Sequence, residues 1–521
     1  MTRFVRAPSL ALLTLVSLAC TDPSPDDGAS TDDEVGTSEG DTGTTGDSSE
    51  SGTETETSES ETTGDTEATD DTEESDESTD TGGDPECGAP ATFEDGQQPS
   101  AELHVATDGA DSPDCGAPDQ PCASIEHAAG LATPGTAVRV HAGTYAGGGY
   151  IAGLTGSADA PIWIGGAPGE ARPLIDGGGQ AFQLSEARYV IIHDLEVANA
   201  TQNGINVDDG GNTADPEAAR FIVLRDLWIH DVGAGGNQDC LKLSGLDDYW
   251  VLDSEFARCG GGGSGSAIDH VGCHRGLIYA NHFSDLGAGG SAVQNKGGAE
   301  DIEIRANVFE DAGQRAINMG GSTGFEFFRP PLSPDQPNAE ARDIRVIANT
   351  FRGGVTPFAF VGCVDCLAAN NVIDTPSSWI FRILQETSST AEYEFLPASG
   401  GRFINNIVSF DGQISTAVNV GGGTDPDSFE ITTNLWHRHD APAQSDPPGM
   451  LPVAEQGGII GEDPLFADPG AGDYHLDPNS PAAGAGTWID ALDGRGGGDL
   501  DEQCWADPPS LGALELPYSL P

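Results

Sequence analysis

Lysine is almost absent from this chain of 521 residues, which contains only Lys242 and Lys296 among its 21 basic residues. Acidic residues number 85, so the formal net charge at pH 7 is −64. General nucleic-acid binding requires a basic surface, and this composition argues against it. The same scarcity makes any local cluster of cations informative about function.

Long hydrophobic runs are also missing. The most apolar stretch, residues 10–18, is too short to span a bilayer as a permanent helix. Arg3 and Arg6 precede it, and it ends in Ser-Leu-Ala-Cys at Cys20, which resembles the lipobox of bacterial lipoproteins. A plain secretory signal with a chance cysteine is the alternative. We expect residues 1–19 to be a lipoprotein signal peptide and Cys20 to be lipidated.

Residues 20–86 have almost nothing that could form a core. From residue 21 onward this segment contains 25 acidic residues, no Lys or Arg, and Val35 as its one aliphatic residue larger than alanine. Such a segment cannot bury enough apolar surface to offset the entropy of the chain. We expect a disordered, self-repelling tether. It would hold a folded domain, residues 87–521, at the cell envelope, on the outer membrane or cell surface, with no membrane contact beyond the lipid.

The ten cysteines suit an exported protein, in which disulfides form readily. With Cys20 lipidated, nine remain, so one thiol must stay unpaired. We expect a local pair between Cys115 and Cys122, and Cys363 with Cys366 is a second candidate. A zinc site is the weaker interpretation, because no histidine lies at metal-ligand spacing beside either pair.

From about residue 138 the chain consists of short apolar strands separated by Gly, Asn and Asp, and only 123–131 reads as a helix. Two strand patterns alternate with a rough period of 21–36 residues, which is typical of a solenoid. The first pattern includes AFQL (181–184), CLKL (240–243) and AINM (316–319). The second includes VIIHDLEV (190–197) and DIEIRANVF (301–309).

Polar residues recur at one position of the second pattern and predict a ladder at a turn of the coil. Inward amides at such a corner can satisfy neighbouring backbone groups, so we expect a structural role. The expected ladder consists of Asp194, Asp226, Asn281, Asn307, Asn349 and Asn370.

The opening LHVATDGADSPDCGAPDQPCASIEHAAGLATPGTAVRVHAGTY and the closing segment from Glu462 to Glu515 resemble the right-handed parallel β-helix superfamily of pectate lyases and related polysaccharide enzymes. The resemblance covers about residues 101–515. It implies an all-β, single-stranded right-handed parallel β-helix solenoid with a short N-terminal capping helix and an irregular C-terminal tail. We expect a monomer. The fold hosts lyases, hydrolases, epimerases and adhesins, so it does not determine activity.

The outward position of the first pattern should form a continuous polar strip, because stacked strands lie about 4.8 Å apart. Its first column is Gln183, Asn206, Lys242, Asp269, Gln294, Asn318, Ala359, Arg382 and Asn419. A second column, two residues later, is Ser185, Asp208, Ser244, Val271, Lys296 and Gly320. Small residues before most of these strands leave room for an extended sugar chain. A solvated sheet face is the alternative.

Both lysines fall in this polar strip, two rungs apart. A lysine amine can lose its proton, whereas a guanidinium stays charged. In the superfamily's lyases that act on uronic-acid polymers, a Lys and an Arg on neighbouring rungs serve as base and acid-side partner, and Lys296 with Arg315 looks like that pair. Lys242 is a further catalytic candidate. Alternatively, both lysines are structural cations tied to Asp208, Asp239 or Asp269.

Other residues near the strip are candidates for contact with substrate. Two insertions, 321–341 and 385–401, interrupt the period and should rise beside it, where long loops commonly build sites. His270 lies at a nominally inward position and is more often a core histidine. The expected substrate-binding residues are Asp269, Gln294, Asn318, His270, His274, Arg329, Arg382 and Phe328. Oxygen ligands from Asp208, Asp239 and Asp269 could hold Ca²⁺, although no calcium-loop motif is present.

The leading hypothesis is therefore an extracellular lyase that cleaves an acidic, uronate-containing polysaccharide by β-elimination. The proton on C5 of a uronate becomes acidic when the carboxylate is neutralised and the developing charge is stabilised. A C5-epimerase uses the same proton abstraction. An inverting glycoside hydrolase would need two suitably spaced carboxylates, and a non-catalytic glycan-binding adhesin would need no reaction at all.

Overall fold

The computed structural model describes residues 87–233, 236–287 and 289–516. The expected signal peptide, Cys20 and the acidic tether lie outside the described residues. The described residues all belong to one unit. Within the described residues, no helix has the length and apolar character needed to cross a bilayer.

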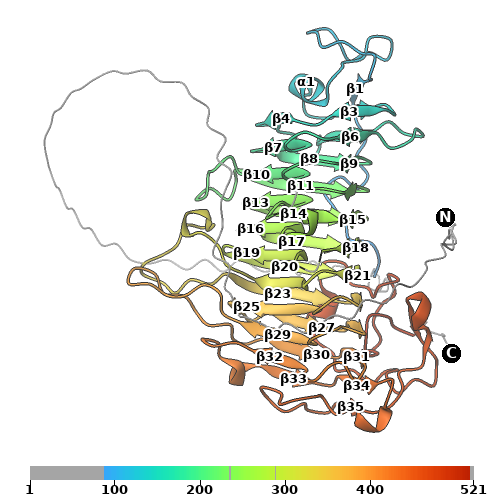
Figure 1. Cartoon of the computed structure of the whole chain (residues 1–521). Coiled ribbons are helices and arrows are strands. Elements are labelled where there is room, and N and C mark those ends of the chain that lie inside the picture. The colour runs from blue at the N-terminus through green and yellow to red at the C-terminus, as the bar shows by residue number, and fades with distance from the viewer. Residues whose placement is uncertain (1–86, 234–235, 288, 517–521) are drawn as a thin grey trace, which may run out of the picture. The chain divides into compact units, whose positions relative to one another are not determined.

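Short strands rich in β-branched and apolar residues stack along one axis in three parallel sheets (Figure 1). The sheet with the polar strip, here called the strip sheet, runs through β4 (Gly149–Ala152), β7 (Phe182–Ser185), β10 (Ile205–Asp208), β13 (Leu241–Ser244), β16 (Ser266–Val271), β19 (Ser291–Lys296), β22 (Arg315–Gly320), β25 (Phe358–Val361), β29 (Phe381–Leu384) and β32 (Val418–Val420).

The second sheet, here called the long sheet, contains β1 (Ala101–Val105), β2 (Thr136–Val140), β5 (Ile162–Gly166), β8 (Arg188–His193), β11 (Ala219–Arg225), β14 (Leu246–Leu252), β17 (His274–Tyr279), β20 (Ala299–Arg305), β23 (Ala341–Ile347), β26 (Cys363–Val364), β27 (Leu367–Ala369), β30 (Arg402–Ile404) and β33 (Glu430–Thr432).

The third sheet contains β3 (Thr144–Ala146), β6 (Leu174–Asp176), β9 (Glu196–Ala198), β12 (Trp228–His230), β15 (Glu255–Ala257), β18 (His282–Leu286), β21 (Val308–Ala312), β24 (Thr350–Arg352), β28 (Val372–Asp374), β31 (Ile407–Phe410), β34 (Leu435–Arg438) and β35 (Ile459–Ile460). An antiparallel pair, β36 (Phe466–Asp468) and β37 (Asp473–Leu476), lies in the C-terminal tail. From β2 to β32, each turn of the coil thus contributes to all three parallel sheets, as expected for a parallel β-helix.

The inward side chains of the three sheets form one continuous apolar core. Phe256, Phe283, Phe309 and Phe351 stack on successive rungs with ring centroids 4.7 to 5.1 Å apart. Burial of each such side chain contributes about 2 to 3 kcal/mol. Stacking of like residues on like residues therefore explains why the strand pattern repeats.

The asparagine ladder exists, but its membership differs from the prediction. Asn281, Asn307 and Asn349 are correct, and each side-chain oxygen accepts the backbone N–H of the equivalent residue one rung earlier. The ladder continues through Asn371, Asn406 and Asn434. Asp194, Asp226 and Asn370 lie one position earlier, at the residue that turns with positive φ. This position favours Asn and Asp, which is why the two columns look alike in sequence.

The expected cap is present as α1 (Ile125–Leu131), which begins where the Ser124 hydroxyl accepts the backbone N–H of His127.

Cys115 pairs with Cys122, as predicted, and Cys363 pairs with Cys366. The sulfurs of Cys115 and Cys122 lie near the ligand atoms of Asp111 and His127, but the disulfide removes the thiolates that zinc requires. Cys240 also pairs with Cys259 and Cys87 with Cys504, and Cys273 is a buried free thiol among the described cysteines.

Both ends of the folded domain cover the outer face of the long sheet. Near the N-terminal end, the ring of Phe93 packs 5.5 Å from that of Tyr189 and 5.9 Å from that of Trp250. Near the C-terminal end, the Arg305 guanidinium donates to the carbonyl oxygen of Gly498 at 2.9 Å. The disulfide Cys87–Cys504 joins the two ends. The long sheet is thus partly covered by the termini.

Candidate functional site

Strand pairing confirms the first column of the polar strip. The residues from Gln183 to Asn419 are direct partners on successive rungs, and Tyr150 on β4 precedes Gln183 in the same register. Each step along the column is about 4.8 Å. The strip is therefore a real row of outward side chains.

The second column is correct as far as Lys296 and wrong at its last member. The register shifts between β19 and β22, so Gly320 pairs with Asn295 instead of Lys296. Gly321 takes the place beside the lysine, where an added Cβ would lie 3.2 Å from the Cβ of Lys296. A bulge of this kind is not visible in a repeat pattern.

The two lysines meet at one carboxylate. Asp269 lies on β16, between the strands that carry Lys242 and Lys296. Its Oδ2 atom forms a short ion pair with Lys242 and lies 3.8 Å from the Nζ of Lys296. The Nζ of Lys242 also lies 3.7 Å from Asp239 Oδ2. We call these four residues the lysine–aspartate cluster.

Exposure separates the members of the lysine–aspartate cluster. The side chains of Asp239 and Asp269 are each 2% exposed, that of Lys296 is 9% exposed, and that of Lys242 is 21% exposed. Lys242 is thus the member most able to touch a molecule on the strip. The carboxylates lie behind it and hold it.

The two carboxylates have opposite pKa shifts. Burial and the nearby charge of Asp269 raise the pKa of Asp239 to about 6, and its Oδ1 accepts the backbone N–H of Ser266 at 2.7 Å. Burial also acts to raise the pKa of Asp269, but the two lysine ammonium groups hold it below its ordinary value. Asp269 is therefore the anion on which the cluster is built.

Arg315 is not beside Lys296. It pairs with Ser291 at the first residue of β22, whereas Lys296 is the last residue of β19. Its guanidinium donates to Glu386 at 2.8 Å and to Asn318 at 3.4 Å. The predicted Lys296–Arg315 pair is therefore corrected, because neighbouring rungs bring side chains together only at equivalent positions along the strand.

Gln294 and Asn318 lie in the strip as predicted. Gln294 is half-buried, whereas Asn318 is largely buried and donates to the Ser291 hydroxyl at 2.9 Å. Arg382 lies two rungs beyond Asn318, over the ring of Trp379 at 4.5 Å, and donates to the Asn419 side chain at 2.9 Å. It does not join the lysine–aspartate cluster.

Neither histidine candidate faces the strip. His270 is fully buried in the coil, where its Nδ1 donates to the Gln294 carbonyl oxygen at 2.9 Å. Burial lowers its pKa to about 4. His274 is held by Asp247 at 3.2 Å and by the carbonyl oxygens of Gly298 and Arg329, each at 3.2 Å. The prediction that these two residues bind substrate on the strip is corrected, because His270 is buried inside the coil and His274 lies on β17 of the long sheet.

The first insertion is also fastened to the coil. Arg329 forms a buried two-point ion pair with Asp209, at 2.6 and 2.9 Å. It passes over Gly245 and Gly272, where an added Cβ would lie within 2.6 Å of its side chain. Phe328 is buried against Phe395 of the second insertion, with ring centroids 5.6 Å apart. These contacts correct the prediction that Arg329 and Phe328 bind substrate.

Glu340 is an important residue that the sequence did not single out. It is 1% exposed and links three segments. One oxygen accepts the backbone N–H of Gly297 at 2.9 Å and the Thr323 hydroxyl at 2.8 Å. The other accepts the Thr323 N–H at 3.0 Å and the Thr387 hydroxyl. Glu340 thus joins both insertions to the turn that follows Lys296.

The three aspartates proposed for Ca²⁺ do not fit that ion. Asp208 lies at the far end of its strand, where Gln183, Asn206 and Gly210 donate to it at 2.7 to 2.9 Å. The carboxylates of Asp239 and Asp269 face lysine ammonium groups. In the part of the chain that the structure describes, the group of three or more potential ligands around Asp111 is the only one.

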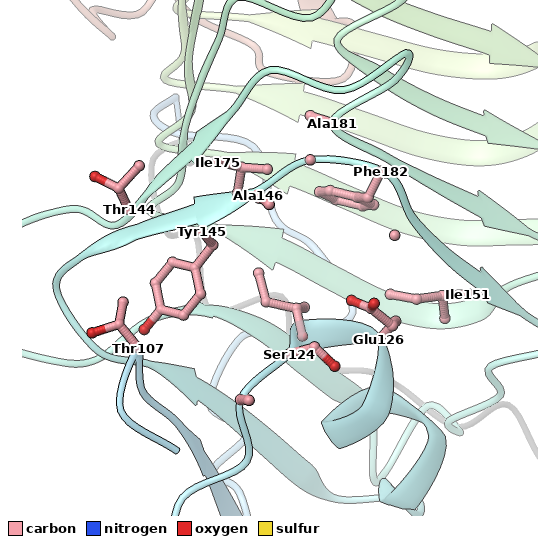
Figure 2. A pocket seen from close by; sticks show the side chains of 15 residues that line it. Thr107, Ser124, Glu126, Thr144, Tyr145, Ala146, Ile151, Ile175, Ala181 and Phe182 are labelled. Carbon is pink, nitrogen blue, oxygen red and sulfur yellow. The ribbon is translucent and has the colours of Figure 1, made fainter. Parts of the chain in front are cut away.

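A cavity of about 340 Å³ opens elsewhere, at the capped end of the coil (Figure 2). Tyr145, Ile151, Ile175 and Phe182 line it together with Glu126 at the start of α1. None of the predicted site residues lines this cavity, so it is separate from the polar strip.

No family model and no curated protein matches the chain. Solved structures do. Pectate lyase Pel9A is 13% identical, with a TM-score of 0.50, over 82% of this chain and 99% of that one. The chain is a right-handed parallel β-helix. An alginate lyase from Paenibacillus sp. str. FPU-7 is 16% identical, with a TM-score of 0.42, over 64% of this chain and 99% of that one. At these identities the β-helix likeness shows the fold alone.

Proposed function

We propose that this β-helix is a lyase that cleaves a uronate-containing polysaccharide by β-elimination at the polar strip. One observation carries the proposal: the only two lysines of the chain converge on Asp269 in the strip. A row of outward amides flanks them. Amides suit sugar hydroxyls, and cations suit uronate carboxylates.

In this proposal the Lys242 ammonium, the more exposed of the two, first releases its own proton to solvent, and the resulting neutral amine then accepts the proton from C5 of the sugar. The C4–O bond then breaks, a C4–C5 double bond forms, and the departing oxygen takes a proton from water. Lys296 supplies positive charge near the substrate carboxylate. The sequence interpretation assigned the base to Lys296, and the difference in exposure favours Lys242 instead. The carboxylates of Asp239 and Asp269 are too buried to protonate a glycosidic oxygen or to activate an attacking water, which disfavours an inverting hydrolase.

Arginine substitutions test the two roles. Lys242→Arg keeps the charge but cannot accept a proton at neutral pH, so we expect loss of the ultraviolet absorbance of the unsaturated product. Lys296→Arg should retain part of the activity, and Lys296→Ala should lose most of it. The assay would use polygalacturonate and alginate, with and without a chelator. Formation of unsaturated product by Lys242→Ala at the wild-type rate would exclude the proposed base.

Glycan binding without turnover is a second candidate, favoured by the low exposure of three of the four cluster residues. Binding of these polymers without product over long incubation, in the wild-type protein, would support it over the lyase.

We also propose that Cys20 is lipidated and that residues 20–86 tether the domain to the cell envelope. The lipobox-like sequence and the composition of the segment support this. Replacement of Cys20 by Ala should prevent incorporation of labelled fatty acid and release the protein from membranes.

A further inference from the structure

An ion pair crosses the polar strip at β25 and separates the part that carries both lysines from Arg382 and Asn419. In the strip sheet, β25 lies between β22 and β29. Arg315 belongs to β22, and Glu386 follows β29, yet their side chains meet at 2.8 Å. The start of the second insertion must therefore fold back over β25. The outward residues of β25, Ala359 and Val361, are accordingly fully buried.

Other contacts hold this crossing segment in place. The Thr387 hydroxyl donates to the buried Glu340 carboxylate, and Gln385 donates to the carbonyl oxygen of Thr387 at 2.8 Å. Asn338 of the first insertion accepts the backbone N–H of Leu396 at 2.9 Å. The two insertions rise together beside β19 and β25 (Figure 1). We call the segment 385–387, with its Arg315 partner, the end wall.

The opposite end of the strip is open. Its first outward residue, Tyr150 on β4, is 61% exposed and stands in register with Gln183. It is one of few large exposed apolar side chains among the described residues. An aromatic ring that lies in line with a polar row offers a stacking surface for a sugar ring.

We call the part of the strip from Tyr150 to the end wall the proposed trough, and the spacing of the rungs sets its length. Six steps separate β4 from β22, or about 29 Å at 4.8 Å a step. Lys242 on β13 stands three steps, or about 14 Å, from either limit. This length corresponds to several sugar rings on each side of Lys242, and the segment that crosses β25 leaves only the side past Tyr150 for a longer chain.

The strip also differs in chemistry on its two sides. Toward Tyr150, the amide nitrogens of Gln183 and Asn206 are occupied by Asp208, which leaves their side-chain oxygens to accept from sugar hydroxyls. Toward the end wall lies the lysine–aspartate cluster. Carboxylate recognition thus belongs near the closed end.

We propose that the trough binds the end of a linear glycan, with the terminal sugar against the end wall and the rest of the chain passing over Tyr150. Cleavage of the bound glycan rests on the proposed function, but binding of the glycan end does not. Cleavage at Lys242 would release short products of uniform length.

Binding of defined oligogalacturonates and oligoalginates tests the proposal separately from catalysis. Tyr150→Ala should weaken binding of long chains by about fivefold and leave trimers unaffected, since a stacked ring contributes about 1 kcal/mol. Met450→Ala, which also removes an exposed apolar side chain, is the matched control. Equal affinity of wild type and Tyr150→Ala for long chains would overturn the proposal, as would absence of binding to every probe.

Chains with a bulky group on both ends test the end wall. Wild type should bind them poorly, whereas Glu386→Ala, and the size-conserving Glu386→Gln, should bind them better. Arg438→Ala removes a surface ion pair with Asp440 far along the coil and should change nothing. Equal wild-type affinity for blocked and free chains would contradict a closed trough. Failure of the lyase proposal would appear differently, as binding with no unsaturated product.

Discussion

At the scale of residues, one buried carboxylate between two amines organises the candidate site. Asp269 is the only member of the lysine–aspartate cluster that lies within 4 Å of both lysine Nζ atoms. Its charge compensates cations that are themselves largely removed from water. Removal of any member of the cluster should therefore destabilise the fold. The role of each member can be tested by measurements of stability as well as of activity.

Asp269→Asn should destabilise the protein by about 3 kcal/mol, because two poorly solvated ammonium groups lose their shared partner. Urea denaturation gives the measurement. Asp208→Asn is the matched control in the same strip, since neutral amides and a backbone N–H contact Asp208, and its cost should be about 1 kcal/mol. Equal costs for the two variants would show that the lysines do not depend on Asp269.

Asp239 should make stability depend on pH. Its pKa is raised from 3.8 to about 6 in the folded state. Between these values the native protein holds a proton that the unfolded chain has released, so its contribution to stability falls as pH rises from about 4 to about 6. Asp239→Asn lacks this proton. The difference in unfolding free energy between wild type and variant should decline between about pH 4 and about pH 6. A constant difference would show that the pKa of Asp239 is not raised.

At the scale of elements, the two insertions behave as one unit on the strip sheet. Glu340 receives hydrogen bonds from Gly297, Thr323 and Thr387, and burial raises its pKa. The loops thus share a fastening point directly after Lys296. A buried carboxylate that accepts from three segments can set the geometry of all three.

Glu340→Ala should free both insertions together, because their shared acceptor is lost. Limited proteolysis should then cleave within 321–341 and 385–401 several times faster than in wild type. Glu394→Ala, an exposed acid in the second insertion, should leave the cleavage rates unchanged. Faster cleavage of one insertion alone would show that they are independent.

At the scale of the whole domain, the disulfide Cys87–Cys504 closes the coil against its own termini. The paired cysteines are 417 residues apart in sequence. A crosslink over so long a loop restricts the unfolded chain far more than the local pair Cys115–Cys122, which are seven residues apart.

Cys87→Ser with Cys504→Ser should therefore lower the free energy of unfolding by about 5 kcal/mol, and loss of the Cys115–Cys122 pair by about half as much. Chemical denaturation measures both. Glycan binding should persist in the first double variant, because the termini cover the long sheet and not the strip. Loss of glycan binding in this double variant would show that the covered long sheet influences the site on the strip sheet.

The repeat pattern predicted much of this molecule. Alternating apolar residues specify inward and outward faces, and the recurrence of the pattern specifies stacking, so the coil, the cap and most of the strip follow from sequence. The asparagine ladder shows the limit, since Asn370 and Asn371 are both compatible with the pattern. Only the backbone shows which one turns with positive φ.

The sequence by itself determined that Lys242 and Lys296 share one face, because a residue's position in a repeat sets its row. Tertiary structure alone decided what lies beside each row. The bulge at Gly320, the crossing of Glu386 to Arg315 and the burial of Phe328 and Arg329 depend on paths taken by irregular segments. These segments have no repeating pattern, and their contacts join residues that are far apart in sequence. Their paths therefore could not be predicted from local sequence patterns.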